Sequence, residues 1–156
     1  MVASKLLMWS AMTDHTLTPH HRLLVVDDEP TVLAAIAEYL TAYQFAVDTA
    51  REREEAEAMV LVYGYDLVLT DMRLTGAHGR EGLELLRFVR EHQPEARVVL
   101  LTAHGSRELE EEARAHGADE FLGKPLPLSE LAAEIFTQLE FKGTPGREFW
   151  SRSGAR

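Results

Sequence analysis

The sequence predicts a single α/β domain in which five short parallel strands alternate with five helices. The first observation is size, since 156 residues correspond to one ordinary domain with tails. The second is composition, because 46% hydrophobic and 27% charged residues supply a sizeable core without the excess charge of a disordered chain. The third is the alternation of short apolar runs with longer amphipathic segments, which is typical of repeated βα units.

The first half of the domain is predicted to contain two strands and two helices. Residues 23–26 (LLVV) are apolar throughout, as expected of a strand that is buried on both faces. The next helix is indicated by apolar residues that recur every three or four positions over 32–43, with Pro30 in its first turn, after an aspartate that can cap it. Residues 45–47 (FAV) form the second predicted strand, and residues 52–62 form the second predicted helix.

The second half repeats this pattern three times. Strands are predicted at residues 67–69 (LVL) and 98–101 (VVLL), both apolar throughout, and a third at 120–122 (EFL). Helices are predicted over residues 81–92, 107–116 and 128–139. Gly117 is a stop signal immediately after the second of these helices.

The packed domain is predicted to span residues 22–142. Residues 1–21 have no sustained hydrophobic period and end in TPHH, and residues 143–156 are rich in Gly, Pro and Arg. Both stretches are interpreted as tails, and the apolar run near the N-terminus is too short for a signal peptide. Trp9 and Trp150 both fall in the tails, so we expect tryptophan fluorescence to report tail docking.

Charge and composition exclude several functions. A formal net charge of -10 repels nucleic acids and anionic membranes. The absence of cysteine excludes disulfides, thiolate catalysis and cysteine-bound zinc. No apolar stretch approaches the roughly 18–20 residues that span a bilayer. We therefore expect no direct nucleic-acid binding and no membrane insertion, and we expect a protein partner with a basic surface.

Reactive side chains follow the predicted strands at the points where the strands end. The first strand ends in Asp27 and Asp28, the third in Asp71, the fourth in Thr102, and the fifth is followed by Lys124. The carboxyl ends of parallel strands meet at one edge of the sheet, where ligands bind in open α/β folds. We therefore expect three carboxylates, one hydroxyl and one ammonium group in a single site.

Three neighbouring carboxylates repel one another unless a cation lies among them. Hard oxygen ligands favour Mg²⁺, which binds through one or two carboxylates together with phosphate oxygens. Such a site can neutralise a phosphoryl group while a carboxylate attacks its phosphorus atom. Lys124 and Thr102 would supply a cation and a hydrogen-bond donor to the bound group.

Four segments resemble the receiver domain of two-component response regulators, over about residues 22–142. LLVVDDEP is similar to the first-strand motif of that family, DLVLTDMRL to its phosphoacceptor motif, VVLLTAHG to its switch motif and ADEFLGKPL to its lysine-proline motif. The order and spacing of the four motifs make the resemblance specific. It implies a doubly wound, flavodoxin-like (βα)5 fold with strand order 2-1-3-4-5.

Carried over by position, the resemblance implies that Asp71 accepts a phosphoryl group from a phosphohistidine on a histidine kinase or phosphotransfer protein. Asp28 would bind Mg²⁺ directly and Asp27 would complete the acidic pocket through water. Asp71 and the main-chain carbonyl of Arg73 would be further ligands. Lys124 would pair with the acyl phosphate.

The resemblance also implies roles in the response to phosphorylation. Thr102 would move towards the phosphoryl oxygens, Phe121 would be the aromatic switch, and the peptide bond before Pro125 would be cis. Arg73 and His104 would each flank the pocket, two positions after the phosphoacceptor and the threonine respectively. We hypothesise that their bulk and charge set the lifetime of the acyl phosphate.

Some of these residues also allow structural interpretations. Asp28 precedes Glu29 and Pro30 and could simply cap a helix, and Phe121 on a strand is by default a core residue. The segment RLTGAHGREGLELL after the phosphoacceptor lacks the proline that is common in the family. It also has a few more residues before Gly82 than the family usually has.

The implied function is that of a cytoplasmic signalling module rather than an enzyme, acting as a monomer or a phosphorylation-dependent dimer. It would transfer a phosphoryl group to itself and lose it by autodephosphorylation, and the charge would change the surface that binds an unidentified target protein. One alternative is an aspartate-nucleophile phosphatase of the haloacid dehalogenase type. That family requires a second aspartate as general acid, two positions after the nucleophile, where this chain has Arg73. Another is a receiver fragment of a larger regulator.

Overall fold

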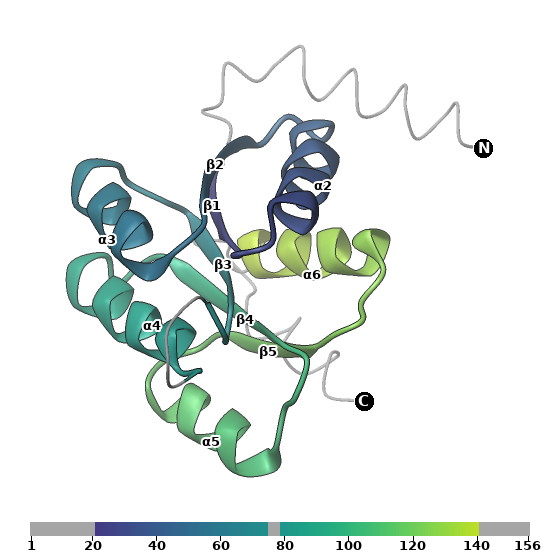
Figure 1. The fold of residues 1–156 in the computed structure, drawn as a ribbon. Helices are drawn as coiled ribbons and strands as arrows, with labels where there is room; N and C mark the ends of the chain where they lie inside the picture. The colour runs from purple at the N-terminus through teal and green to yellow at the C-terminus, as the bar shows by residue number, and fades with distance from the viewer. Residues whose placement is uncertain (1–20, 75–78, 141–156) are drawn as a thin grey trace.

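A computed structural model describes residues 21–74 and 79–140. All five strands of the sheet are parallel and follow the order β2-β1-β3-β4-β5, which confirms the predicted fold class (Figure 1). The strands are β1 (Arg22–Val26), β2 (Ala46–Ala50), β3 (Leu67–Asp71), β4 (Arg97–Thr102) and β5 (Glu120–Gly123). The helices are α2 (Pro30–Thr41), α3 (Arg53–Val62), α4 (Glu81–His92), α5 (Arg107–Ala115) and α6 (Leu128–Glu140).

Helices cover both faces of the sheet, and a hydrophobic cluster fills each interface. Successive side chains of a strand point to opposite faces, so Leu23 and Val25 belong to the cluster beneath α2 and α6. Leu24 and Val26 belong to the other cluster, to which α3 and α4 contribute. Figure 1 shows α2 and α6 together on one face and α3 and α4 on the other. Burial on both faces explains the continuous apolar runs within β1, β3 and β4.

The second strand differs from the prediction. β2 covers Ala46–Ala50 (AVDTA), so Phe45 precedes the strand, and most of its residues are partly or fully exposed. The physical reason is that β2 lies at an edge of the sheet, where polar side chains are tolerated. Its Asp48 forms an ion pair with Arg22 at 2.9 Å, so this strand has no continuous apolar run.

The start of α2 and the end of α5 were both predicted from single residues in the sequence. Pro30 lies in the first turn of α2 as predicted, but the residue at the N-cap position is Glu29, and its side chain forms no capping hydrogen bond. Neither preceding aspartate therefore caps this helix. Gly117 follows α5 with a φ of +100°, a left-handed conformation that glycine adopts without strain, and it ends the helix as predicted.

Two predictions concern the parts of the chain beyond the packed elements. The predicted tails lie outside the described residues, apart from His21, and so do residues 141 and 142 at the end of the predicted domain. Within the described ranges, no helix is long and apolar enough to cross a membrane.

Candidate functional site

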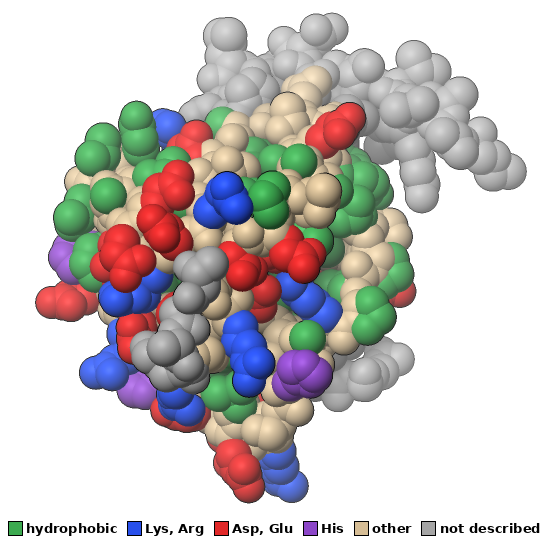
Figure 2. Space-filling view, viewed as in Figure 1, with side chains coloured by type: hydrophobic (Ala, Val, Ile, Leu, Met, Phe, Trp, Pro, Cys, Tyr) green, Lys and Arg blue, Asp and Glu red, His purple; other side chains and the backbone are tan. Residues whose placement is uncertain are grey.

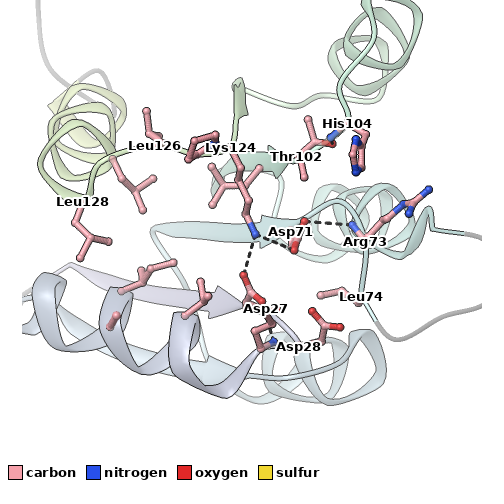
Figure 3. A pocket seen from close by; sticks show the side chains of 18 residues that line it. Asp27, Asp28, Asp71, Arg73, Leu74, Thr102, His104, Lys124, Leu126 and Leu128 are labelled. Atoms are coloured by element: carbon pink, nitrogen blue, oxygen red, sulfur yellow. Dashed lines mark hydrogen bonds and ion pairs between the residues drawn. The ribbon is translucent and has the colours of Figure 1, made fainter.

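The predicted reactive residues meet at the carboxyl edge of the sheet. Asp27 follows β1, Asp71 ends β3, Thr102 ends β4 and Lys124 follows β5. Together with Asp28, Arg73, His104 and Pro125 they line one cavity of about 920 Å³. Figure 3 shows the Lys124 side chain extending between the carboxylates of Asp71 and Asp27. The parallel register brings these residues together although nearly one hundred positions separate the first from the last.

Lys124 connects the two most buried carboxylates of the site. Its Nζ atom lies 3.0 Å from Oδ2 of Asp71 and 3.2 Å from Oδ2 of Asp27. Asp27 is 2% exposed, and its Oδ1 atom accepts a hydrogen bond of 2.9 Å from the main-chain N–H of Glu29. A buried carboxylate needs such partners, because removing an unpaired charge from water is costly. The peptide bond between Lys124 and Pro125 is cis.

The charges of the site shift the pKa values of Asp71 and Lys124. Burial raises the pKa of Asp71 above its ordinary value; the Lys124 ammonium opposes this shift and the Asp27 carboxylate adds to it. Burial disfavours the charged form of Lys124, but its hydrogen bonds and charge interactions with Asp71 and Asp27 outweigh that effect and raise its pKa. Lys124 is therefore held as an ammonium group between two carboxylates, where it can also pair with an added anion.

The three aspartates fit a divalent cation. One carboxylate oxygen each from Asp27, Asp28 and Asp71 lies within 4.8 Å of the others. The donors are all hard oxygen atoms, which suit Mg²⁺ better than softer metals. The main-chain N–H of Arg73 points to Oδ1 of Asp71 at 3.4 Å, so the carboxylate has donors on two sides. The residues present therefore match the expected metal, and the helix-cap interpretation of Asp28 does not apply.

The remaining predicted residues divide between the cavity and the core. Thr102 is buried at the cavity wall, and its Oγ1 atom accepts a hydrogen bond of 3.2 Å from the N–H of His104. Arg73 and His104 are exposed at the rim. Phe121 does not line the cavity; it is partly buried against the hydrophobic cluster beneath α3 and α4. A Cβ atom on Gly105 would lie 3.0 Å from the Thr102 methyl and 3.2 Å from the Phe121 ring. The main chain at Gly105 therefore lies close to both side chains.

An apolar wall of the cavity was not predicted from the sequence. Its hydrophobic members come from α2, from the segment after β5 and from α6. The spacing that indicated two amphipathic helices gave no means of telling a cavity-facing residue from a core residue. The wall consists of Val32, Ile36, Leu126, Leu128 and Leu131.

The fold and the site together define a class of protein: a doubly wound α/β domain with an acidic, lysine-containing pocket at the ends of its strands. Comparison with known families makes this assignment specific, because residues 23–136 match the response regulator receiver domain family. The chain belongs to this family of two-component signalling domains. Receiver domains of response regulators interact with histidine kinases and generally bind Mg²⁺. The family assignment gives no support to the phosphatase alternative.

Individual relatives agree with the family assignment. The response regulator protein PilR of Pseudomonas aeruginosa is 32% identical over 127 residues, which cover 81% of this chain and 28% of that protein. The transcriptional regulatory protein TcrA of Mycobacterium tuberculosis is 39% identical over 114 residues, which cover 73% of this chain and 44% of that protein. The chain thus spans between about a quarter and a half of these relatives.

A solved structure shows the same fold. It is the CheY-like response regulator receiver domain protein from Methanospirillum hungatei, and it is 25% identical with a TM-score of 0.74. The superposition covers 80% of this chain and 97% of that protein. The match extends over nearly the whole of that structure, so the two chains share the complete arrangement of that fold.

Proposed function

We propose that Asp71 accepts a phosphoryl group from a phosphohistidine on a histidine kinase or phosphotransfer protein, and that the added charge switches a protein-binding surface. The supporting observation is the position of Lys124 Nζ, within 3.2 Å of both Asp71 and Asp27. An ammonium group beside a raised-pKa carboxylate, in a cavity open to a donor, suits capture of a tetrahedral anion. The proposed domain comprises residues 22–142, between tails 1–21 and 143–156.

The chemistry is a transfer of one phosphoryl group. A carboxylate oxygen of Asp71 attacks phosphorus, the bond between phosphorus and the donor imidazole nitrogen breaks, and the imidazole leaves with the bonding electrons. Lys124 pairs with the new phosphoryl oxygens, and the Thr102 hydroxyl donates to them. Asp27, Asp28, Asp71 and the Arg73 carbonyl would hold Mg²⁺, which supplies positive charge at the phosphoryl oxygens.

The switch would extend from Thr102 to Phe121. A Cβ atom on Gly105 would touch both the Thr102 methyl and the Phe121 ring, so the two side chains border the same space, and a movement of Thr102 towards the phosphoryl group would enlarge that space beside the aromatic ring. Phe121 would then change the surface near α5 and β5, which a target protein reads. We propose that this occurs in the cytoplasm, without direct nucleic-acid contact by the domain, which the net charge of -10 supports.

Labelling by acetyl phosphate with Mg²⁺ tests the phosphoacceptor. Asp71→Asn should abolish labelling, because an amide oxygen is too weak a nucleophile to form the acyl phosphate. The matched control is Glu108→Gln, which makes the same carboxylate-to-amide change at an exposed position of α5 and should label like the wild type. Stoichiometric labelling of the Asp71→Asn protein would refute the assignment.

The same assay follows the decay of the label. Arg73 and His104 are exposed at the rim of the cavity, where their side chains can obstruct the water that hydrolyses the acyl phosphate. In the Arg73→Ala, His104→Ala double variant, we expect the rate of autodephosphorylation to change while labelling persists. An unchanged decay rate would show that these two side chains do not set the lifetime.

A second candidate function is that of a receiver fragment of a larger regulator. The observation that favours it is the share of the relatives that the chain covers, 28% and 44%. In that case the phosphoryl chemistry at Asp71 is the same, and the switched surface contacts an output domain instead of a separate protein.

A further inference from the structure

Three adjacent apolar residues are exposed at the end of α3. They lie where the strands of the sheet begin, opposite the strand ends that carry Asp71. Among the described residues, the large hydrophobic side chains that are exposed are Leu61 (63%), Val62 (72%) and Tyr63 (42%). Figure 2 shows hydrophobic side chains gathered at the upper left, over this end of α3. Exposed apolar residues that adjoin one another in this way mark a candidate interaction surface.

This surface, which we call the α3-end patch (Leu61, Val62 and Tyr63), borders a preformed groove. The groove has a volume of about 560 Å³ and lies between the end of α3 and the turn from α4 to β4. Gln93 holds the two walls together: its Nε2 atom donates to the carbonyls of Val60 and Tyr63 at 2.7 Å, and its Oε1 atom accepts from the N–H of Tyr65 at 2.8 Å. The patch is therefore fixed in place before anything binds to it, which reduces the entropic cost of docking.

The chain that precedes β1 joins the domain beside this patch. The Arg22 carbonyl accepts a hydrogen bond of 2.8 Å from the N–H of Asp66, three positions after Tyr63. The Arg22 guanidinium carbon lies 4.1 Å from the centre of the Tyr63 ring. Residues 1–20 lie outside the described structure, and they are connected to the domain within contact distance of the patch.

The sequence of residues 1–20 suits this surface. It contains the apolar run Leu6-Leu7-Met8-Trp9, and Lys5 just before this run is the only charged side chain among the first twelve residues. The groove is lined by Glu95, whose carboxylate is complementary in charge to Lys5. Arg22 lies thirteen positions after Trp9, and an extended chain of that length reaches about 40 Å, which allows residues 6–9 to turn back to the patch beside Arg22.

We infer that residues 6–9 of the N-terminal segment dock on the α3-end patch of the same molecule and cover its apolar side chains. The opposite end of the chain is less suited, because residues 141–156 follow α6, which packs on the other face of the sheet. A second copy of this chain is also less suited, because two surfaces of a protein with a net charge of -10 repel one another. The docked segment would thus lie where the strands begin, at the opposite end of the sheet from the phosphoacceptor site.

Tryptophan fluorescence of the full chain tests this inference. In the Trp150→Phe protein, Trp9 is the remaining tryptophan, and we expect its emission to be shifted to shorter wavelength and protected from acrylamide. The added changes Leu61→Ser and Val62→Ser should remove both effects. They alter exposed side chains, so folding should be unaffected, and far-ultraviolet circular dichroism checks this. Leu6→Ser with Leu7→Ser should have the same effect without altering the folded domain.

The matched control is the Trp9→Phe protein, in which Trp150 should not respond to changes in the patch. The inference is supported if the Trp9 shift is independent of protein concentration and is lost in both pairs of variants. It is overturned if Trp9 emits like a solvent-exposed indole, if the patch variants leave its emission unchanged, or if Trp150 responds instead. A shift that disappears on dilution also overturns it, because that result identifies a second copy as the occupant.

Discussion

Replacement of Gly82 by alanine should destabilise the protein, although alanine favours helices. Gly82 is the second residue of α4, and its N–H donates a hydrogen bond of 2.9 Å to the Met72 carbonyl. A Cβ atom there would lie 2.3 Å from the Asp71 carbonyl oxygen and 2.7 Å from the Met72 Cα atom. Both contacts are with main chain, so no side-chain rotation relieves them, and the start of α4 must move by about 1 Å to reach an ordinary carbon–oxygen distance.

The magnitude follows from three opposing effects. Overpacking costs about 1–3 kcal/mol, and weakening the Gly82–Met72 hydrogen bond costs about 1 kcal/mol. The higher helix propensity of alanine offsets about 1 kcal/mol of this cost. We therefore expect Gly82→Ala to lower the free energy of unfolding by about 2 kcal/mol. With a urea dependence of about 1–3 kcal/mol per molar, the midpoint of urea unfolding should fall by about 1 M.

Gly64→Ala is the matched control. No heavy atom lies within 4 Å of a Cβ atom at this position, so the substitution only restricts the unfolded chain and should be neutral or stabilise by about 0.5 kcal/mol. Urea denaturation of the two variants and the wild type decides the question. A Gly82→Ala protein as stable as the wild type would show that α4 does not pack against the main chain at Asp71 as described.

Two further predictions concern buried polar groups far from the site. The Asp119 carboxylate binds Arg90 at 2.5 Å and Arg97 at 2.9 Å, so Asp119→Ala leaves the buried Arg97 without its ion pair. We expect this variant to lose about 3 kcal/mol of unfolding free energy, measured by urea denaturation. A loss below about 1 kcal/mol would contradict this expectation. Burial and a hydrogen bond to Asp48 raise the pKa of Tyr65, so the folded state retains the phenol proton above the ordinary tyrosine value of about 10. The stability from Tyr65 is therefore complete below that pH and declines above it. Tyr65→Phe should be about 1–2 kcal/mol less stable at pH 8, with a difference that narrows as the pH rises above 10, and a constant difference would exclude this linkage.

The sequence predicted those features that depend on local pattern. The strands buried on both faces were found because each is a continuous apolar run, and Asp71 was placed correctly at a strand end for the same reason. The edge strand β2 begins one residue later and ends three residues later than predicted, because Asp48, which pairs with Arg22 on the neighbouring strand, interrupts its apolar pattern. The two contacts of Lys124 and the three partners of Asp119 join residues far apart in the chain. Such contacts depend on register and side-chain direction, which a sequence pattern does not contain.

The reach of Lys124 has a consequence for the fluctuations of the native state. β5 has four residues, none of them fully buried, and it pairs only with β4 within the described sheet. Edge elements of this kind open locally at lower free energy than the centre of a domain. Lys124 extends from the end of β5 past β4 to the carboxylate of Asp71 at the end of β3 and that of Asp27 just after β1. The opening of β5, and of the α6 segment that follows it, is therefore coupled to the charge at Asp71, so an edge of the sheet responds to chemistry at its centre.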